Sequence, residues 1–297
     1  MNKTILQVIL GFSLLAIASC KGKTENTPAY IHIERIDFNY DNISTVGNGG
    51  VAITDAWVYE NDNVIGVFEL PATIAVTASG EKEFSVRPGI KLNGISATRE
   101  YYRFYEPWKK DINILPLDTV TVEPSTRYYP ETHNSFRENF EDVVIKFDSS
   151  SSSDVSLVRT KVENGDPQFL ENYVGVATMN SNKSYFKAYT SESFLVPVTS
   201  VLPIYLEMDY KCNTELSVST LIQIPSSGVF EDRVITLKST VVNGEMVWKH
   251  IYIDFTDRFI GQTEATGFGF SFTALHNIAN TESFIYLDNT KVVSTTP

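Results

Sequence analysis

Residues 101–110 combine aromatic and cationic side chains in a pattern that suits recognition of a sugar. The run reads Tyr-Tyr-Arg-Phe-Tyr-Glu-Pro-Trp-Lys-Lys. Sugars bury the apolar faces of their rings on flat aromatic side chains, while polar neighbours bind the hydroxyl groups. The candidate ligand-binding residues are Tyr101, Tyr102, Arg103, Tyr105 and Trp108. An alternative is that the run forms an ordinary strand and loop whose aromatic rings pack between two domains.

The cations of this region have two interpretations. Arg99, Arg103, Lys109 and Lys110 suit sulfate or carboxylate groups, or they offset an acidic surface. The whole chain has a formal net charge of −12. Binding of a nucleic acid backbone requires clustered positive charge, so we expect no nucleic acid partner.

The sequence lacks the common motifs of enzymes. It has no G-x-S-x-G, H-E-x-x-H, G-x-x-x-x-G-K-[ST] or C-x-x-C pattern. The four histidines (His32, His133, His250 and His276) lie far apart, and none has a partner at the spacing of a metal site or a catalytic triad. We therefore expect a protein without enzymatic activity. A hydrolase whose site converges only in the fold is the less favoured alternative.

The start of the chain predicts export and lipidation. Ile5 to Ile17 is a mostly apolar run that is too short to span a membrane, and it is typical of a signal peptide covering residues 1–19. Its end, Ile17-Ala18-Ser19-Cys20, resembles the bacterial lipobox. That resemblance implies diacylglycerol on the Cys20 thiol, cleavage before Cys20 and acylation, for example by palmitate, of the new amino terminus. The alternative is an ordinary signal peptide followed by a chance cysteine.

The predicted anchor implies a place at the outer membrane. Two or three acyl chains hold a protein stably in a bilayer, whereas one does not. Residues 20–29 would be the lipidated cysteine and a polar tether. Because Lys21-Gly22-Lys23 is basic, either the periplasmic face or the cell surface remains open. The second thiol, Cys212, is expected to be a small buried residue.

Period-two alternation predicts an all-β protein of two domains. Residues 52–59 and 64–68 flank Asn61-Asp62-Asn63 and predict a hairpin, and regular short strands then predict an Ig-like or small β-sandwich over 30–126. Residues 127–138 lack periodicity and are expected to be a linker. In the second domain, 139–297, Ile204, Leu206, Met208 and Tyr210 alternate with polar residues, and strands without helices predict a jelly roll. The serine-rich stretch 148–154 is expected to be a loop.

Two resemblances cover nearly all of the mature chain. The segments 57–71 and 87–96, which include Trp57-Val58-Tyr59 and Arg87-Pro88-Gly89, look like a family of Bacteroidota-type outer-membrane lipoproteins of unassigned function. The second half resembles galactose-binding-like jelly rolls, as found in carbohydrate-binding modules, through Asn139-Phe140-Glu141, Trp248 and the closing strand 285–289. The second resemblance implies a fold that several unrelated functions share.

The jelly-roll resemblance also implies a structural calcium ion joining the first and last strands. Glu141 and Asp288 match the positions from which its ligands would come. Calcium takes six to eight oxygens, so two carboxylates are only part of a site. The alternative is that both carboxylates cap strand ends by accepting hydrogen bonds from backbone amides. No other cofactor is expected.

The sequence therefore favours a lipid-anchored envelope protein that binds a ligand, most simply a glycan. An alternative is a structural or assembly lipoprotein that binds a partner protein of the envelope. Coplanar exposed aromatic rings in a cleft would favour the first interpretation, and a flat apolar patch would favour the second.

Overall fold

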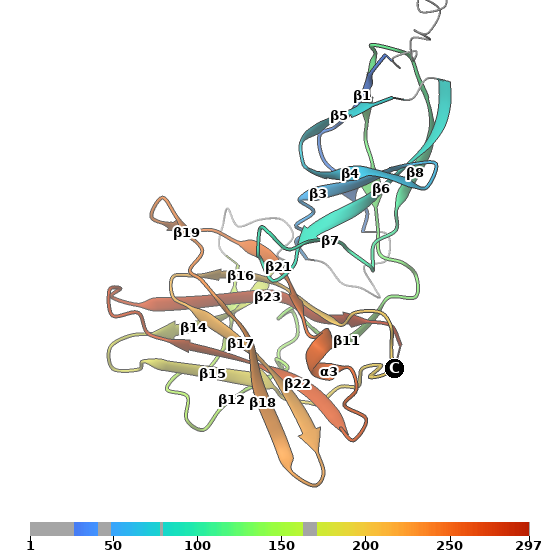
Figure 1. Cartoon of the computed structure of the whole chain (residues 1–297). Coiled ribbons are helices and arrows are strands. Elements are labelled where there is room, and N and C mark those ends of the chain that lie inside the picture. Colours follow the sequence, from blue (N-terminus) through green and yellow to red (C-terminus); the bar gives the residue numbers. More distant parts are fainter. Residues whose placement is uncertain (1–26, 41–48, 78–79, 163–170, 297) are drawn as a thin grey trace, which may run out of the picture.

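The structure, a computed structural model, describes residues 27–40, 49–77, 80–162 and 171–296 and consists of two β-sandwich domains (Figure 1). The predicted signal peptide 1–19, Cys20 and most of the tether 20–29 lie outside the described residues. Within the described part of the chain, no helix combines the length and apolar character needed to cross a membrane.

The first domain is a small sandwich of two sheets. One sheet has the order β5-β1-β9, formed by Ala72–Val76, Ala29–Ile33 and Thr119–Val122. The other contains β3 (Asp55–Glu60), β4 (Asn63–Glu69), β6 (Gly80–Lys91), β7 (Arg99–Tyr101) and β8 (Trp108–Ile114). Alternate side chains of both sheets meet in one core that includes Ile31, Ile74, Val58, Phe84 and Ile114. A short ladder of β2 (Asp37–Phe38) with β10 (Ser125–Thr126) leads towards the second domain.

The predicted hairpin is confirmed. β3 and β4 pair antiparallel around a tight turn, in which Asn61 and Asp62 adopt φ values of 46° and 61°. Asparagine and aspartate tolerate this left-handed conformation better than most residues, and two such residues in sequence match the twist of the flanking strands.

The second domain is a jelly roll of two larger sheets. The six-stranded sheet comprises β11 (His133–Glu138), β13 (Val158–Lys161), β14 (Tyr173–Met179), β16 (Tyr205–Cys212), β21 (Lys249–Asp254) and β23 (Ser283–Ser294). The five-stranded sheet has the order β12-β15-β22-β17-β18, formed by Phe147–Ser149, Tyr185–Thr190, Gly267–Leu275, Leu216–Ile224 and Gly228–Leu237. A phenylalanine-rich core fills the space between them. The predicted fold class, all-β with a small Ig-like sandwich followed by a jelly roll, is confirmed.

Three minor elements complete the described part of the second domain. β19 (Val241–Val242) pairs with β20 (Glu245–Met246), and α3 (Thr256–Phe259) is a single helical turn. The serine-rich stretch is mainly a turn, because β12 ends at Ser149.

The interval 127–138 is not a linker throughout. Its second half forms β11, which pairs with β23, so the jelly roll begins at His133 rather than at residue 139. Phe136 lies in the jelly-roll core and Glu138 is buried. Periodicity did not predict this strand, because it is only six residues long and its register shifts between Asn134 and Phe136.

The two domains meet over β16, which is buried on both faces. Its residues Leu206 and Met208 face the jelly-roll core, whereas Tyr205 joins an aromatic cluster with Tyr102 and Tyr252 at the junction. Backbone pairing also crosses the junction. Leu92 of the small domain forms a β-bridge with Tyr252 of the jelly roll, and the Asn93 amide donates to the Tyr252 carbonyl at 2.8 Å. The domains are therefore joined by shared core and backbone hydrogen bonds rather than by a flexible linker alone.

Candidate ligand-binding groove

The outer face of the five-stranded sheet carries a groove, because its central strand has small side chains there. β22 alternates Gly267, Gly269, Ser271 and Thr273 on the outer face with phenylalanines on the inner one. Opposite residues of an antiparallel ladder share a face. Ser219 of β17 pairs with Ser271, so small residues continue onto the next strand.

Larger side chains stand on both sides of this row. β15 presents Tyr185, Lys187 and Tyr189 on the outer face, and Tyr189 pairs with Ser271 across the ladder. Because a serine stands beside it, part of the Tyr189 side chain remains accessible. β18 contributes Glu231 and Arg233 from the opposite side. Tyrosine rings on one wall and hydroxyl groups on the floor are the groups that bind sugar rings and sugar hydroxyls.

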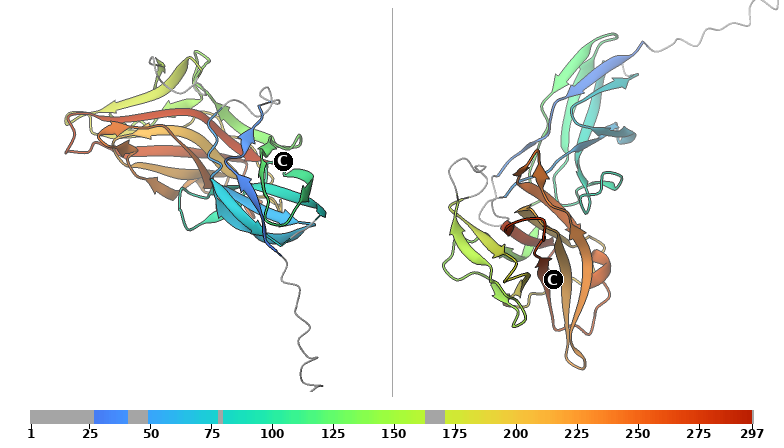
Figure 2. Two further views of the ribbon diagram at one scale, coloured as in Figure 1. Left: turned by 90° about the horizontal axis from the view of Figure 1, so that it is seen from above. Right: turned by 90° about the vertical axis from the view of Figure 1, so that its left-hand side faces the viewer.

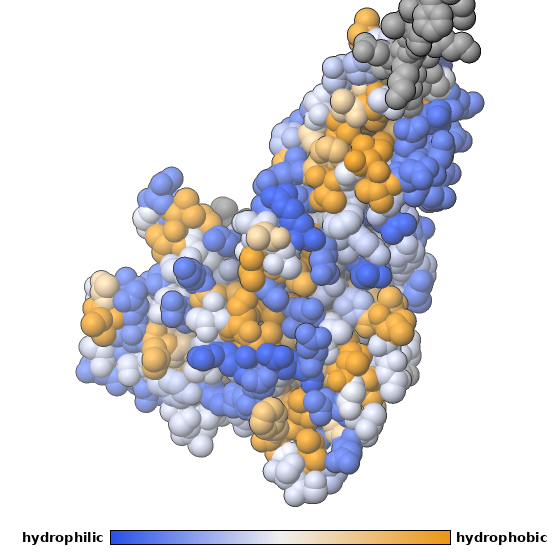
Figure 3. Space-filling view, viewed as in Figure 1, coloured by the Kyte–Doolittle hydropathy of each residue, from blue (hydrophilic) through white to orange (hydrophobic). Residues whose placement is uncertain are grey.

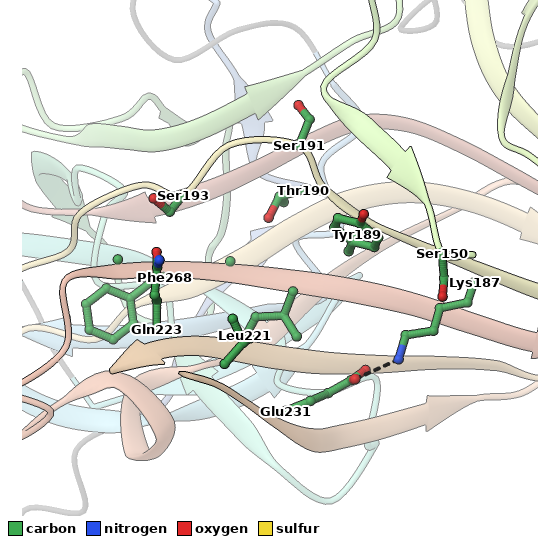
Figure 4. A pocket seen from close by; sticks show the side chains of 13 residues that line it. Ser150, Lys187, Tyr189, Thr190, Ser191, Ser193, Leu221, Gln223, Glu231 and Phe268 are labelled. Carbon is green, nitrogen blue, oxygen red and sulfur yellow. Dashed lines mark hydrogen bonds and ion pairs between the residues drawn. The ribbon is translucent and has the colours of Figure 1, made fainter. Parts of the chain in front are cut away.

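Lys187 and Glu231 meet across the floor of the groove (Figure 4). Lys187 Nζ lies 2.6 Å from Glu231 Oε2, and Ser271 Oγ donates to Glu231 Oε1 at 2.7 Å. Burial raises the pKa of Glu231, but the hydrogen bonds from Lys187 and Ser271 outweigh it, so its pKa is lowered. Glu231 is thus an ionised hydrogen-bond acceptor fixed in position.

Three adjoining hollows make up the groove. The first has a volume of about 510 Å³, is lined by Tyr189, Leu221 and Gly269 among others, and contains the Lys187–Glu231 pair. The second, of about 380 Å³, shares that pair and adds Arg233. The third, of about 800 Å³, shares Arg233 and extends to Tyr185 and Lys238. Since neighbouring hollows share lining residues, the groove crosses the sheet as one continuous feature.

The aromatic run predicted to bind a ligand lies elsewhere and is divided by the fold. Tyr102 and Tyr105 are buried, 1% and 3% exposed, in the junction between the domains. The prediction is wrong for these two residues, because their rings pack against Tyr205 and Tyr252. That packing is the alternative interpretation of the sequence.

The other three residues of the run lie on the small domain. Tyr101 is partly exposed, with the Arg103 guanidinium 4.8 Å from its ring centroid, and Trp108 packs against the core. The nearby cations have protein partners: Arg99 meets Asp55 and Glu69, and Lys109 lies 3.5 Å from Glu83. Arg99 and Lys109 thus form ion pairs with carboxylates of the protein itself. None of the residues 101–110 lines the three hollows of the groove.

The two carboxylates predicted to bind calcium have hydrogen-bond donors of their own. Glu141 Oε1 accepts from the amides of Asn172 and Tyr173 at 2.6 and 2.9 Å, which is the capping alternative. Asp288 is 1% exposed, and burial, with the nearby negative charges of Asp209 and Glu141, raises its pKa to about 9. Among the described residues, no three His, Cys, Asp or Glu side chains converge in a way that could hold a metal ion. Calcium stays a prediction.

Buried charges gather where the small domain covers β16. Glu207 and Asp209 are fully buried, and His250 Nδ1 lies 2.8 Å from Asp209 Oδ1 while Lys291 Nζ lies 3.3 Å from Glu207 Oε2. The small domain supplies three donors, the hydroxyls of Tyr102 and Tyr128 to Glu207 and the amide of Gly50 to Asp209. We call Glu207, Asp209, His250 and Lys291 the junction cluster.

Of His32, His250 and His276, one lies at the groove. His250 lies in the cluster rather than on a surface or in one of the three hollows. His276 lines the third hollow, where its Nδ1 lies 3.0 Å from Ser283 Oγ. His32 contacts Thr73 and Glu34 on the small domain. His276 therefore shares the third hollow with Glu215 and several hydroxyl groups, whereas the residues that line the first and second hollows include no histidine.

The jelly roll is similar to solved carbohydrate-binding modules. A family 28 module specific for non-crystalline cellulose aligns with 14% identity over 54% of this chain and 94% of its own, at a TM-score of 0.38. A family 22 xylan-binding domain from Paenibacillus barcinonensis aligns with 13% identity over 54% of this chain and 99% of its own, at 0.37. A family 29 module, solved with mannohexaose, aligns with 11% identity over 55% of this chain and 93% of its own, at a TM-score of 0.32.

Sequence comparison gives no further relative. No protein-family model matches the chain, and no curated protein matches it. The groove was not predicted from the sequence, because its lining residues are spread over four strands, β15, β17, β18 and β22, between residues 185 and 275. The one local signal was Gly267 to Thr273, in which small residues alternate with phenylalanine. A strand with bulky residues on one face and small ones on the other marks a surface that another molecule can approach.

Proposed function

We propose that the protein binds glycan chains, without cleaving them, in the groove on the five-stranded sheet of its jelly roll. The observation that carries this proposal is the row Gly269, Ser271 and Ser219 between the tyrosines of β15 and the Lys187–Glu231 pair. Stacking on tyrosine supplies affinity for any sugar ring, and the fixed polar groups of the floor set the orientation of the ligand.

A binding role rather than hydrolysis agrees with the charges of the groove. Glycosidases use two carboxyl groups flanking the bond to be cleaved, one of them with a raised pKa as the general acid. In the first hollow Glu231 is the one carboxylate among the lining residues, and its pKa is lowered by Lys187 and Ser271. Such a carboxylate accepts hydrogen bonds from sugar hydroxyls but is a poor proton donor.

The site of action is also part of this proposal. Cleavage before Cys20 and lipidation of its thiol would place the domains at the outer membrane, where glycans of the envelope or of the surroundings are in reach. Release of radiolabelled palmitate from the purified protein, and its loss in Cys20→Ser, would test the anchor separately from binding.

A binding measurement on a glycan array, followed by calorimetry with the best oligosaccharide, tests the main proposal. Tyr189→Ala should weaken binding by about two- to tenfold, since stacking of an aromatic pair contributes about 0.5–1.5 kcal/mol beyond area burial and about 1.4 kcal/mol corresponds to a factor of ten. Tyr30→Ala, which removes a partly buried tyrosine of the small domain, is the matched control and should leave affinity unchanged. A folded protein that binds no glycan at millimolar concentration would refute the proposal.

A second candidate function, binding of a partner protein, is favoured by one other observation. On the face seen in Figure 3, hydrophobic side chains gather on the small domain over β1, β4 and β5. β4 is an edge strand, and its Val64 and Val67 are 63% and 39% exposed. Exposed apolar edge strands are sites at which another chain can pair. Crosslinking in the intact envelope, lost on Val64→Lys and unaffected by Tyr189→Ala, would distinguish this function from glycan binding.

A further inference from the structure

We propose that the groove selects glycans that carry acidic groups, because its third hollow holds cations that the protein itself does not neutralise. This inference rests on the proposed function and concerns the class of ligand. It starts from a contrast between two halves of the same groove. In the first hollow the lysine and the carboxylate, Lys187 and Glu231, pair at 2.6 Å and cancel each other.

The other half has no such compensation. Arg233 follows Glu231 by two positions on β18, lies opposite Ser219 and lines both the second and the third hollow. No residue that the structure describes forms a hydrogen bond or an ion pair with its guanidinium. Lys238, which lines the third hollow with it, has no ion pair among the described residues either. Glu215 is the one acidic residue that lines this hollow.

The lack of a carboxylate partner distinguishes Arg233 from four arginines of the described structure. The net charge is −12, and other arginines of the described structure meet carboxylates: Arg99 contacts Asp55 and Glu69, Arg127 contacts Glu106, and Arg258 contacts Asp232. In an acidic protein, carboxylates outnumber cationic side chains and are available to form ion pairs with them. Glu231, two positions before Arg233 on β18, already pairs with Lys187 at 2.6 Å.

The surroundings of Arg233 fit a sugar with an acidic substituent. Its planar guanidinium can form two parallel hydrogen bonds to a carboxylate or a sulfate. Tyr185 provides a ring at the same hollow, and Thr236, Ser217 and Asn213 provide groups for hydroxyls. A uronic acid or sulfated sugar could therefore stack on Tyr185 while its charged group meets Arg233 and Lys238. The planar carboxylate of a uronic acid is the closer match to the fork of Arg233.

The test compares oligosaccharides of equal length by calorimetry at low salt and in 0.5 M NaCl. The probes are an oligogalacturonide, a sulfated oligosaccharide and neutral xylo- and cello-oligosaccharides. We expect an acidic probe to bind at least about tenfold more tightly than the neutral ones, and salt to reduce that preference. Arg233→Gln should abolish the preference, while Arg35→Gln, which removes the same charge from an exposed site on the small domain, should not.

The variants separate the outcomes. Arg233→Lys keeps the positive charge but loses the pair of parallel N–H donors. Affinity for the uronate probe should therefore fall more in this variant than affinity for the sulfated probe. Preference for either acidic probe that depends on Arg233 supports the inference and identifies the acidic group. Equal binding of neutral and acidic probes, unaffected by Arg233→Gln, would overturn the inference and leave the proposed function standing. Loss of all binding to every probe, with the wild-type protein folded, would overturn both.

Discussion

Removal of one charge from the junction cluster should destabilise the protein far more than the same change on its surface. Glu207 is fully buried and accepts hydrogen bonds from the hydroxyls of Tyr102 and Tyr128, and Lys291 Nζ lies 3.3 Å from it. Glu207→Gln keeps the shape of the side chain but leaves Lys291 without its carboxylate and His250 with Asp209 alone. Breaking a buried ion pair from one side costs about 3–5 kcal/mol.

The pKa of Glu207 gives the sign of the pH dependence. Burial opposes its ionisation, but Lys291, His250 and Tyr102 outweigh burial and lower its pKa to about 2. A lowered pKa means that the folded state holds the ionised form better than the unfolded state does. The contribution of Glu207 is therefore fully present above its ordinary pKa of 4.5 and is lost as the pH falls towards 2. The difference between wild type and Glu207→Gln should shrink over the same interval.

Urea denaturation at pH 7, followed by far-ultraviolet circular dichroism and by intrinsic fluorescence, measures the loss. Because the cluster joins donors of one domain to acceptors of the other, we also expect the two probes to separate in the variant, as each domain then unfolds more independently. Glu81→Gln, an exposed position on β6, is the matched control and should change stability by less than about 0.5 kcal/mol. The double variant Glu207→Gln/Lys291→Met should recover part of the loss, because neither charge then remains unpaired. A loss below about 1 kcal/mol for Glu207→Gln, with unchanged cooperativity, would refute the argument.

Two further predictions concern buried titratable groups. Burial lowers the pKa of His250, but Asp209 and Glu207 outweigh burial and the pKa is raised. The contribution of His250 to stability should therefore be fully present below pH 6.5 and be lost as the pH rises through the raised value. A flat melting profile from pH 6 to 9, or an unchanged slope in His250→Asn, would contradict this. The groups facing His250 are Asp209 and Glu207 of β16, Lys291 of β23 and the Tyr252 ring of β21, whose centroid is 4.7 Å away. Asp288, with its pKa raised to about 9, costs stability increasingly as the pH rises from 3.8 towards 9, so Asp288→Asn should raise the melting temperature at pH 8 in a chelator and equally in calcium. A calcium-dependent rise in the wild type that Asp288→Asn removes would instead establish the predicted metal site.

The outline of the fold was predictable from the sequence, because apolar and polar residues alternate along a strand that buries one of its faces. Residues 204–211 alternate in a way that predicted β16, and the apolar set does lie in the jelly-roll core. Glu207 and Asp209 alternate with that set and lie on the opposite face of the strand. Glu207 and Asp209 are buried there because a domain that begins some 170 residues earlier in the chain covers them, and periodicity within one strand carries no information about that cover.

The groove was not predictable for a related reason. A run such as 101–110 concentrates aromatic residues in one place, and in this structure that density fills the junction between domains. The groove instead takes alternate residues from several strands, among them Tyr189, Arg233 and Gly269, and the sheet register brings them together. Residues that are ordinary in their own segment become a site through strand pairing.

The rigid junction has a consequence for how the groove would be displayed. β1 starts at the end of the small domain that faces away from the jelly roll (Figure 2). Shared core and the junction cluster fix the two domains to each other. If Cys20 is lipidated as we propose, the small domain would act as a stiff spacer between the membrane and the groove. Many copies on one membrane would present their grooves at a common height, so a long polymer lying along that membrane could be bound by several copies at once, with an avidity that exceeds the affinity of one groove.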